Sequence, residues 1–196
     1  MAQRAAPLDI DARAGVSDRP WGARWRCSRL SSSGGFGMSK VSESVEVNVP
    51  VRTAYDQWTQ FESFPRFMGG VEEVRQLSDT STAWRTKIGG VTREFNADIV
   101  EQVPDRRVAW RSTDGAHAGQ VSFEELDPAR TRVTADITFE PEGLVENVGD
   151  KLGVVDHRVE GDLERFKEYI ESQGAESGAW RGEVRQGRVT DERPSI

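Results

Sequence analysis

Cysteine is almost missing from this chain of 196 residues, because its one cysteine, Cys27, lies in the amino-terminal segment. An internal disulfide bond needs two cysteines, and a cysteine-based metal cluster needs several. Histidine is nearly as scarce, with only His117 and His157. The sequence therefore predicts no disulfide bond and no metal centre, and nothing in it indicates a bound cofactor.

Long apolar runs are missing as well. No stretch approaches the roughly 18 consecutive apolar residues that a membrane-spanning helix needs. The first residues also lack the apolar centre of a secretory signal peptide. The single cysteine fits a reducing compartment. We therefore expect a cytoplasmic protein without a transmembrane segment.

The sequence also lacks the motifs of several functional classes. No Ser-His-Asp pattern, phosphate-binding glycine loop or cysteine nucleophile stands out, so covalent catalysis has no visible support. The formal charge is −7, and residues 1–37 contribute +3 from six arginines and three aspartates, which leaves −10 for the remainder. Because an acidic domain repels phosphate backbones, we expect no nucleic-acid partner.

Residues 1–38 have neither helical nor strand periodicity, and they combine scattered arginines with prolines and a Ser/Gly-rich stretch. We expect a disordered amino-terminal extension. Met38 stands directly before the first alternating strand, so an alternative is that translation begins there and the upstream residues are a start-site artefact. Another alternative is a basic arm with Trp21 and Trp25 for an anionic surface or for transit across an organelle membrane.

Alternation of apolar and polar residues predicts the strands of an antiparallel sheet. The expected strands cover 41–49, 71–77, 83–88, 91–103, 107–113, 120–126 and 132–140, and two short helical turns cover 51–59 and 61–68. Short turns of glycine, proline and aspartate join the strands, which favours a meander. One face of this sheet is apolar and consists of Trp84, Ile88, Phe95, Ala97, Ile99, Val108, Trp110, Val121, Phe123, Val133, Ala135, Ile137 and Phe139.

The last long element is an amphipathic helix over 144–170, where apolar residues recur at steps of three or four and Gly174 supplies a stop. Gly149, Gly153 and Gly161 each cost such a helix roughly 1 kcal/mol relative to alanine. They indicate either close backbone approach to the sheet or a softened lid that admits a ligand. A curved antiparallel sheet closed by this helix encloses a cavity, so the sequence predicts an α+β fold with a small-molecule pocket.

Five stretches together carry a family resemblance: Trp58–Met68, Ile88–Gly90, Val108–Ser112, Gly119–Phe123 and Gly178–Val184. Their order resembles bacterial proteins of the START-related SRPBCC superfamily, and within it the polyketide cyclase/dehydrase or coenzyme Q-binding START-like branch. The resemblance implies a helix-grip fold, in which a seven-stranded curved sheet grips a long C-terminal helix around a hydrophobic cavity. The resemblance covers about 39–184. We expect the ligand-binding domain to span 39–174 and residues 175–196 to form a flexible C-terminal tail.

The superfamily that the chain resembles includes lipid carriers, hormone receptors, ring-hydroxylating oxygenase subunits and aromatase/cyclases. The fold alone therefore leaves the activity open. Oxygenase chemistry would need an iron site of two histidines and a carboxylate, and this chain has only two histidines in all. We therefore do not expect the oxygenase activity.

Two polar residues are weak catalytic candidates. His117, in the turn 114–119, is either an acid or base at the cavity rim or, as we favour, a solvent-exposed loop histidine. Arg93 has inward parity near a glycine turn, so its guanidinium either grips a carboxylate, phosphate or enolate oxygen of a ligand or snorkels to solvent. Glu101 shares the inward parity, but its position near a strand end makes solvent exposure the expectation, and His157 lies on the polar side of the helix.

The expected ligand-binding residues have inward positions on the sheet, the short turns and the helix. They are Trp58, Phe61, Phe64, Phe67, Trp84, Arg93, Phe95, Trp110, Phe123, Leu152, Val155 and Val159. Trp84 and Trp110 either stack on a flat ring or simply fill the core.

Three functions fit these observations. The first is a non-catalytic binder of a hydrophobic small molecule of lipid, isoprenoid/quinone or polyketide-like chemistry. The second is a polyketide cyclase or dehydratase that folds its substrate in a dry cavity and stabilises an enolate through polar groups such as Arg93 or His117. The third is a protein-interaction or stress-associated module that docks on a partner through residues 178–184, and the alternative for this segment is that Trp180 folds back on the domain.

Overall fold

The computed structural model describes residues 39–88, 90–139 and 151–190. In chain order the elements are β1 (Ser39–Val47), α1 (Val51–Trp58), the 3₁₀ helix η1 (Phe61–Arg66), β2 (Val71–Ser78), β3 (Ser81–Ile88), β4 (Val91–Val103), β5 (Arg107–Ser112), β6 (His117–Asp127), β7 (Arg130–Phe139), α3 (Lys151–Gln173), β8 (Glu183–Arg185) and β9 (Arg188–Thr190). The predicted extension 1–38, the predicted helical residues 144–150 and the end of the tail, 191–196, lie outside the described residues.

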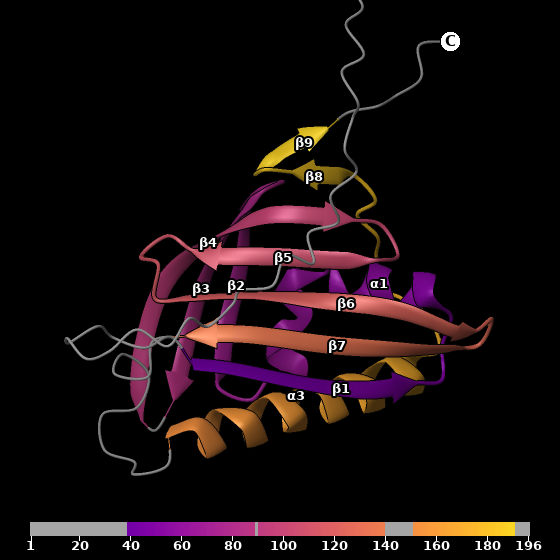
Figure 1. The fold of residues 1–196 in the computed structure, drawn as a ribbon, viewed down its shortest axis with the longest axis horizontal. Helices are drawn as coiled ribbons and strands as arrows, with labels where there is room; N and C mark the ends of the chain where they lie inside the picture. The colour runs from indigo at the N-terminus through magenta and orange to yellow at the C-terminus, as the bar shows by residue number, and fades with distance from the viewer. Residues whose placement is uncertain (1–38, 89, 140–150, 191–196) are drawn as a thin grey trace, which may run out of the picture. The chain divides into compact units, whose positions relative to one another are not determined.

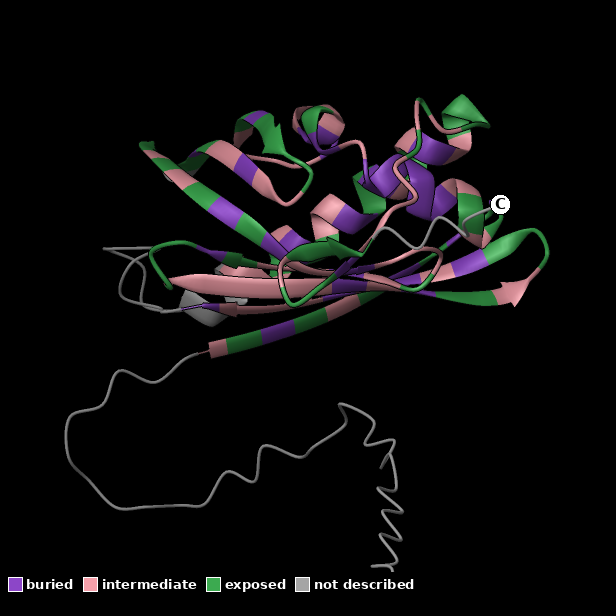
Figure 2. Ribbon diagram, turned by 90° about the horizontal axis from the view of Figure 1, so that it is seen from above, coloured by how far each residue is buried: buried purple, intermediate pink, exposed green. Residues whose placement is uncertain are grey.

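The strands form one antiparallel sheet in the order β1-β7-β6-β5-β4-β3-β2, so the predicted meander is confirmed (Figure 1). β1 crosses over to pair with β7 along its whole length, from Ser39 opposite Phe139 to Val47 opposite Thr131. The sheet has nine strands instead of the predicted seven, because β8 and β9 extend it beside β4. The helices α1 and α3 lie on the same side of the sheet, where they cover its apolar face (Figure 2).

A register shift in β4 alters which of its side chains point inward. The pairing with β5 shifts between Ile99 and Glu101, which is the signature of a β-bulge. Because an extra residue reverses the alternation of side chains, Gln102 is buried after the bulge, while Glu101 is half-exposed and accepts a hydrogen bond from Arg107 at 2.5 Å. The inward parity of Glu101 is therefore lost at the bulge, and its side chain is partly exposed, in line with the solvent exposure expected near the strand end.

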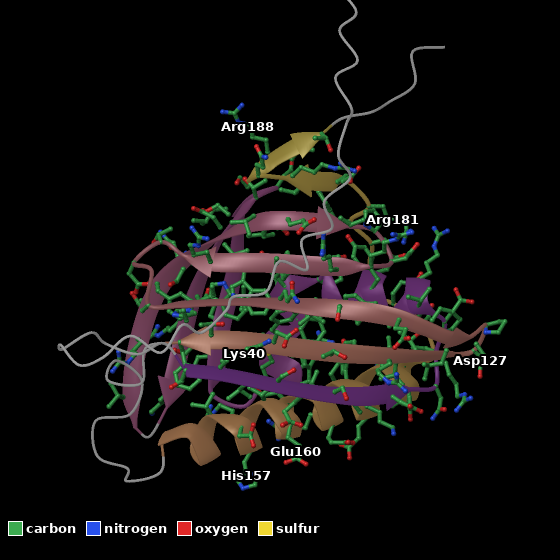
Figure 3. All side chains as sticks on the ribbon, in the orientation of Figure 1. Lys40, Asp127, His157, Glu160, Arg181 and Arg188 are labelled. Atoms are coloured by element: carbon green, nitrogen blue, oxygen red, sulfur yellow. The ribbon has the colours of Figure 1, made fainter. Side chains whose placement is uncertain are left out.

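The long helix α3 packs along β1. Its buried residues Val159, Leu163, Phe166 and Ile170 follow the predicted stripe at steps of three and four. The side chain of His157 points away from the sheet on the exposed side, as predicted (Figure 3).

The short helices α1 and η1 supply an aromatic core. A 3₁₀ helix has three residues per turn, so the spacing of Phe61, Phe64 and Phe67 places all three rings on one side of η1. Trp58, at the end of α1, contacts this group, with its ring centre 5.3 Å from that of Phe64 and 5.0 Å from that of Phe166 on α3. The aromatic core thus joins the short helices to the C-terminal half of α3.

The segment that follows α3 is not the flexible tail that the sequence suggested, at least over residues 175–190. Val184 is fully buried and lies opposite Gln102, where β8 pairs with β4. Trp180 packs against the hydrophobic core. The side chains expected to dock on a protein partner are therefore used within the domain. Strands of three residues are too short to show alternation, which explains why the sequence pattern missed them.

Candidate functional site

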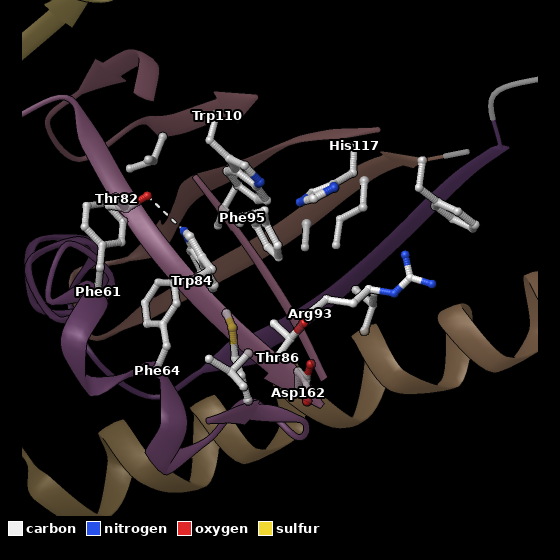
Figure 4. A pocket seen from close by; sticks show the side chains of 18 of the residues that line it. Phe61, Phe64, Thr82, Trp84, Thr86, Arg93, Phe95, Trp110, His117 and Asp162 are labelled. Atoms are coloured by element: carbon white, nitrogen blue, oxygen red, sulfur yellow. Dashed lines mark hydrogen bonds between the residues drawn. The ribbon is translucent and has the colours of Figure 1, made fainter. Parts of the chain in front are cut away.

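A cavity of about 420 Å³ lies between the inner face of the sheet, η1 and α3 (Figure 4). Its lining is mostly aromatic and aliphatic, and the polar groups in it come from a few residues on β3, β4, β6, α3 and the turn between β5 and β6. Pockets of 300–1,000 Å³ with an apolar lining and few polar groups are typical small-molecule sites. The cavity is therefore the candidate functional site.

Most of the predicted ligand-binding residues line this cavity. They are Trp58, Phe61, Phe64, Trp84, Arg93, Phe95, Trp110, Val155 and Val159. Phe67 and Phe123 are instead buried in the aromatic core, where both pack against Trp58, so they do not reach the cavity. The side chain of Leu152 lies outside the described residues.

Trp84 and Phe95 form an aromatic pair in the cavity wall. They lie opposite each other on β3 and β4, and their rings are nearly parallel, 7° apart in plane with centres 6.0 Å apart. The indole N–H of Trp84 donates to Oγ1 of Thr82 at 2.8 Å, and the Thr82 hydroxyl donates to the carbonyl of Ala97 at 3.1 Å. Because the indole N–H already has a partner, Trp84 offers a ligand its apolar ring surface.

The side chain of Trp110 fits in the cavity wall because its neighbour on β6 is a glycine. Gly119 lies directly opposite Trp110. A Cβ atom at Gly119 would lie 2.5 Å from Cζ2 of Trp110, far inside van der Waals contact. The absence of a side chain on Gly119 therefore lets the indole lie flat against β6.

His117 lies in the cavity wall, so the prediction of a solvent-exposed loop histidine is wrong. It is the first residue of β6 and meets the ring of Phe95 edge-on, with ring centres 4.4 Å apart. Burial lowers its pKa below the ordinary value of 6.5, although the nearby carboxylate of Asp114 opposes this shift. At pH 7 the imidazole is therefore neutral and can accept a proton or a hydrogen bond.

Asp162 on α3 is a second titratable group of the cavity, and the sequence analysis missed it. One oxygen, Oδ1, accepts hydrogen bonds from the backbone N–H of Gly69 at 2.7 Å and from the guanidinium of Arg165. Burial raises the pKa of Asp162 above its ordinary value of 3.8, against the effect of these hydrogen bonds. Its position three residues after Val159, on the inward stripe of the helix, was the signal that could have revealed it.

Arg93 also lines the cavity and is half-buried, and its guanidinium lies on the same side of β4 as His117 (Figure 4). Among the described residues, no carboxylate lies within 4.0 Å of it. Thr86, another residue that the sequence analysis missed, is buried in the lining of the same cavity. Its inward parity on β3, two positions after Trp84, was the available signal.

Within 39–88, 90–139 and 151–190, histidine and acidic side chains form no group of three that could hold a metal ion. None of the helices in the same part of the chain combines the length and apolar character that crossing a membrane requires.

The antiparallel sheet, the long C-terminal helix and the apolar cavity between them define an α+β protein of the helix-grip class with a candidate small-molecule site. A family model described as polyketide cyclase / dehydrase and lipid transport matches residues 47–168, which is more than half of the chain. The chain belongs to this family.

A curated relative and two solved structures are also similar to this chain. An uncharacterized 17.2 kDa protein from the melC2-rnhH intergenic region of Streptomyces lincolnensis is 55% identical over 149 residues, which cover 75% of this chain and 99% of that protein. The crystal structure of the Zhui aromatase/cyclase from a Streptomyces species has a TM-score of 0.59 at 16% identity, covering 74% of this chain and all of that one. A START superfamily protein from Mycobacterium smegmatis gives 0.55 at 18% identity, covering 70% and 97%. At these identities the two structures support the fold alone.

Proposed function

We propose that this protein binds a hydrophobic small molecule of lipid, isoprenoid/quinone or polyketide-like chemistry in the cavity between the sheet and α3. The observation that carries the proposal is an apolar cavity of about 420 Å³ in a protein of this size. Natural cores are close-packed and leave few voids larger than a water molecule. A space this large, lined by aromatic rings, is therefore best explained by an occupant.

The polar groups of the cavity indicate that the ligand is amphipathic. Arg93 presents a guanidinium without a carboxylate partner among the described residues, and such a group suits a carboxylate, phosphate or enolate oxygen. Trp84 and Phe95 present nearly parallel rings on which a flat apolar group can lie. A ligand with an apolar body and one anionic or strongly polar oxygen would use both features.

The first test is native mass spectrometry of the protein purified from cells, followed by extraction and identification of any small molecule that co-purifies. A stoichiometric hydrophobic ligand would support the proposal, and its structure would distinguish lipid, quinone and polyketide classes. A protein that carries no ligand and fails to bind a panel of such compounds would overturn it.

A variant that fills the cavity gives an independent prediction. We expect Ile137→Trp to weaken binding of the identified ligand by about tenfold or more, because Ile137 lines the cavity and the larger side chain occupies its space. The matched control is Thr138→Trp, the next residue of β7, whose side chain points to the other face of the sheet. Isothermal titration calorimetry measures both, and equal affinities for the two variants would place the ligand elsewhere.

A second candidate function, polyketide cyclase or dehydratase, is favoured by two titratable groups that line the same cavity. Burial lowers the pKa of His117 and raises that of Asp162, so one group is suited to accept a proton and the other to donate one. Loss of water from a β-hydroxyketone requires removal of a proton from carbon and protonation of the departing hydroxyl. Arg93 would stabilise the enolate oxygen that forms between these steps.

This second function predicts a characteristic pH profile. Because the pKa of His117 lies below 6.5, the imidazole stays neutral as the pH falls to 6.5 and becomes protonated only below that value. We therefore expect the rate on a poly-β-keto or β-hydroxyketone substrate to hold down to pH 6.5 and to fall at lower pH. His117→Asn should abolish this acidic limb and lower the rate by about 100-fold. Unchanged turnover in this variant would exclude His117 as the base.

A further inference from the structure

Residues 177–185 lie against the last turn of α1 and bond to its buried polar side chains. The backbone N–H of Ser177 donates to Oε1 of Gln57 at 2.8 Å, and that of Trp180 donates to Oγ1 of Thr59 at 3.2 Å. Gln57 and Thr59 are 0% and 2% exposed. The C-terminal segment therefore satisfies polar groups that belong to α1.

Arg181 adds a second and stronger attachment. Its Nη1 lies 2.7 Å from Oδ1 of Asp56, a fully buried carboxylate on α1, and the same guanidinium binds both oxygens of Asp105 at 3.0 and 2.5 Å. Asp105 lies between β4 and β5 in the left-handed backbone region, with φ of 61°. The guanidinium also lies 5.8 Å from the ring centre of Tyr55. One arginine thus links the C-terminal segment, α1 and the β4–β5 turn.

The turn of α1 that the segment holds also carries part of the cavity wall. Trp58 lies between Gln57 and Thr59, is 3% exposed and lines the cavity. The amide Nε2 of Gln57 donates to Oγ of Ser63 at 3.1 Å, which connects the same turn to η1 and to its cavity residue Phe64. The polar side of this turn therefore faces the C-terminal segment, while its aromatic residues face the cavity.

The polar cluster beneath Arg181 is incompletely paired. The hydroxyl of Tyr55 and both amide atoms of Gln102 are buried, and among the described residues they form no hydrogen bond of normal geometry, although the amide lies close enough to the hydroxyl to oppose the rise in its pKa. The second oxygen of Asp56 has only Nε of Arg52, at 3.5 Å. Buried polar atoms without partners cost free energy, which offsets part of the stabilisation from the contacts of Arg181. A ligand that binds better when the segment is attached would favour the attached state.

We propose that residues 177–185 form a latch on the ligand cavity, in which Arg181 is a positioning residue that holds Trp58 and η1 in the binding-competent arrangement. The inference rests on the proposed ligand-binding function. A latch of this kind has two measurable consequences. Release of the latch lowers affinity for ligand, and, because coupling between two sites is reciprocal, bound ligand protects the latch.

The test uses the full chain, with Arg181→Ala, Arg181→Lys and the control Arg185→Ala. Arg185 lies in the same segment but is exposed and pairs with Glu183. The probe is the apolar anionic dye 8-anilinonaphthalene-1-sulfonate, and hydrogen exchange is followed by mass spectrometry. We expect Arg181→Ala to weaken dye binding about tenfold, as a tenfold fall in the competent population would. The dye affinity of Arg181→Lys should lie between those of the wild type and Arg181→Ala, and Arg185→Ala should bind the dye like the wild type.

Two exchange measurements separate a latch from a contribution to stability alone. Dye should slow exchange at the amides of Ser177 and Trp180 in the wild type, and a purely structural segment would not respond. Without dye, Arg181→Ala should speed exchange in 58–64 but not in β6 and β7. Wild-type protein that fails to bind dye counts against the proposed function, while unchanged exchange in 58–64 overturns the latch.

Discussion

Replacing Phe166 by alanine should lower the free energy of unfolding by about 3–5 kcal/mol. Phe166 is fully buried on α3, and its ring lies 5.0 Å from Trp58 and 5.2 Å from Phe67, centre to centre. Removing it leaves a cavity where α3, α1 and η1 meet, and three rigid elements cannot all move to fill it. Because single domains are stable by only about 5–15 kcal/mol, this is a large fraction of the total.

Urea denaturation followed by circular dichroism measures this loss. The control is Glu164→Ala on the same helix, where the exposed side chain should matter by less than about 0.5 kcal/mol. Phe166 does not line the ligand cavity, so ligand should stabilise wild type and Phe166→Ala by similar amounts. A loss below about 1 kcal/mol would contradict the packing described for this end of α3.

Gly119→Val should both destabilise the protein by about 1–3 kcal/mol and prevent ligand binding. A side chain at this position meets Cζ2 of Trp110 at 2.5 Å and the backbone carbonyl of Asp136 at 3.0 Å. The carbonyl is part of β7 and cannot move easily, so the indole of Trp110 must move instead. The indole lines the cavity, so a shift away from β6 brings it into the cavity space. The cavity is then occupied by the protein itself.

Ala118→Val is the matched control for this variant, because Ala118 is the preceding residue on β6 and points to the opposite face of the sheet. Valine favours strands, so this change should leave both stability and binding nearly unaffected. Dye titration and thermal unfolding measure the two variants side by side. If Gly119→Val bound ligand as well as the control, Trp110 would not be part of the binding wall.

The main architecture of this protein could be predicted from its sequence because each long element repeats its pattern many times. Alternation over β4, β6 and β7 and the stripe that ends at Ile170 each rest on several buried residues. Periods of 2 and 3.6 residues are local properties of strands and helices. The same parity also placed Trp84, Phe95 and Trp110 on the face where the cavity lies.

Single irregularities and pairings could not be predicted in this way. One bulge between Ile99 and Glu101 exchanged the positions of Glu101 and Gln102, because one added residue reverses the parity of those that follow. His117 looked like a loop residue, yet β6 begins with it because Phe139 on β7 lies opposite and extends the ladder. Such extensions depend on the partner strand and not on the local sequence.

The residue pattern specifies the antiparallel sheet, the amphipathic helix and the apolar face between them, because local alternation and helical spacing place the apolar residues on one face. The polar groups of the cavity meet only on folding, because Arg93, His117 and Asp162 come from three elements far apart in the chain. Folding also decides the role of the C-terminal segment. Arg181 forms its ion pairs only when folding brings Asp56 and Asp105 to one guanidinium. Contacts between residues so far apart in the chain produce no periodic pattern in the sequence.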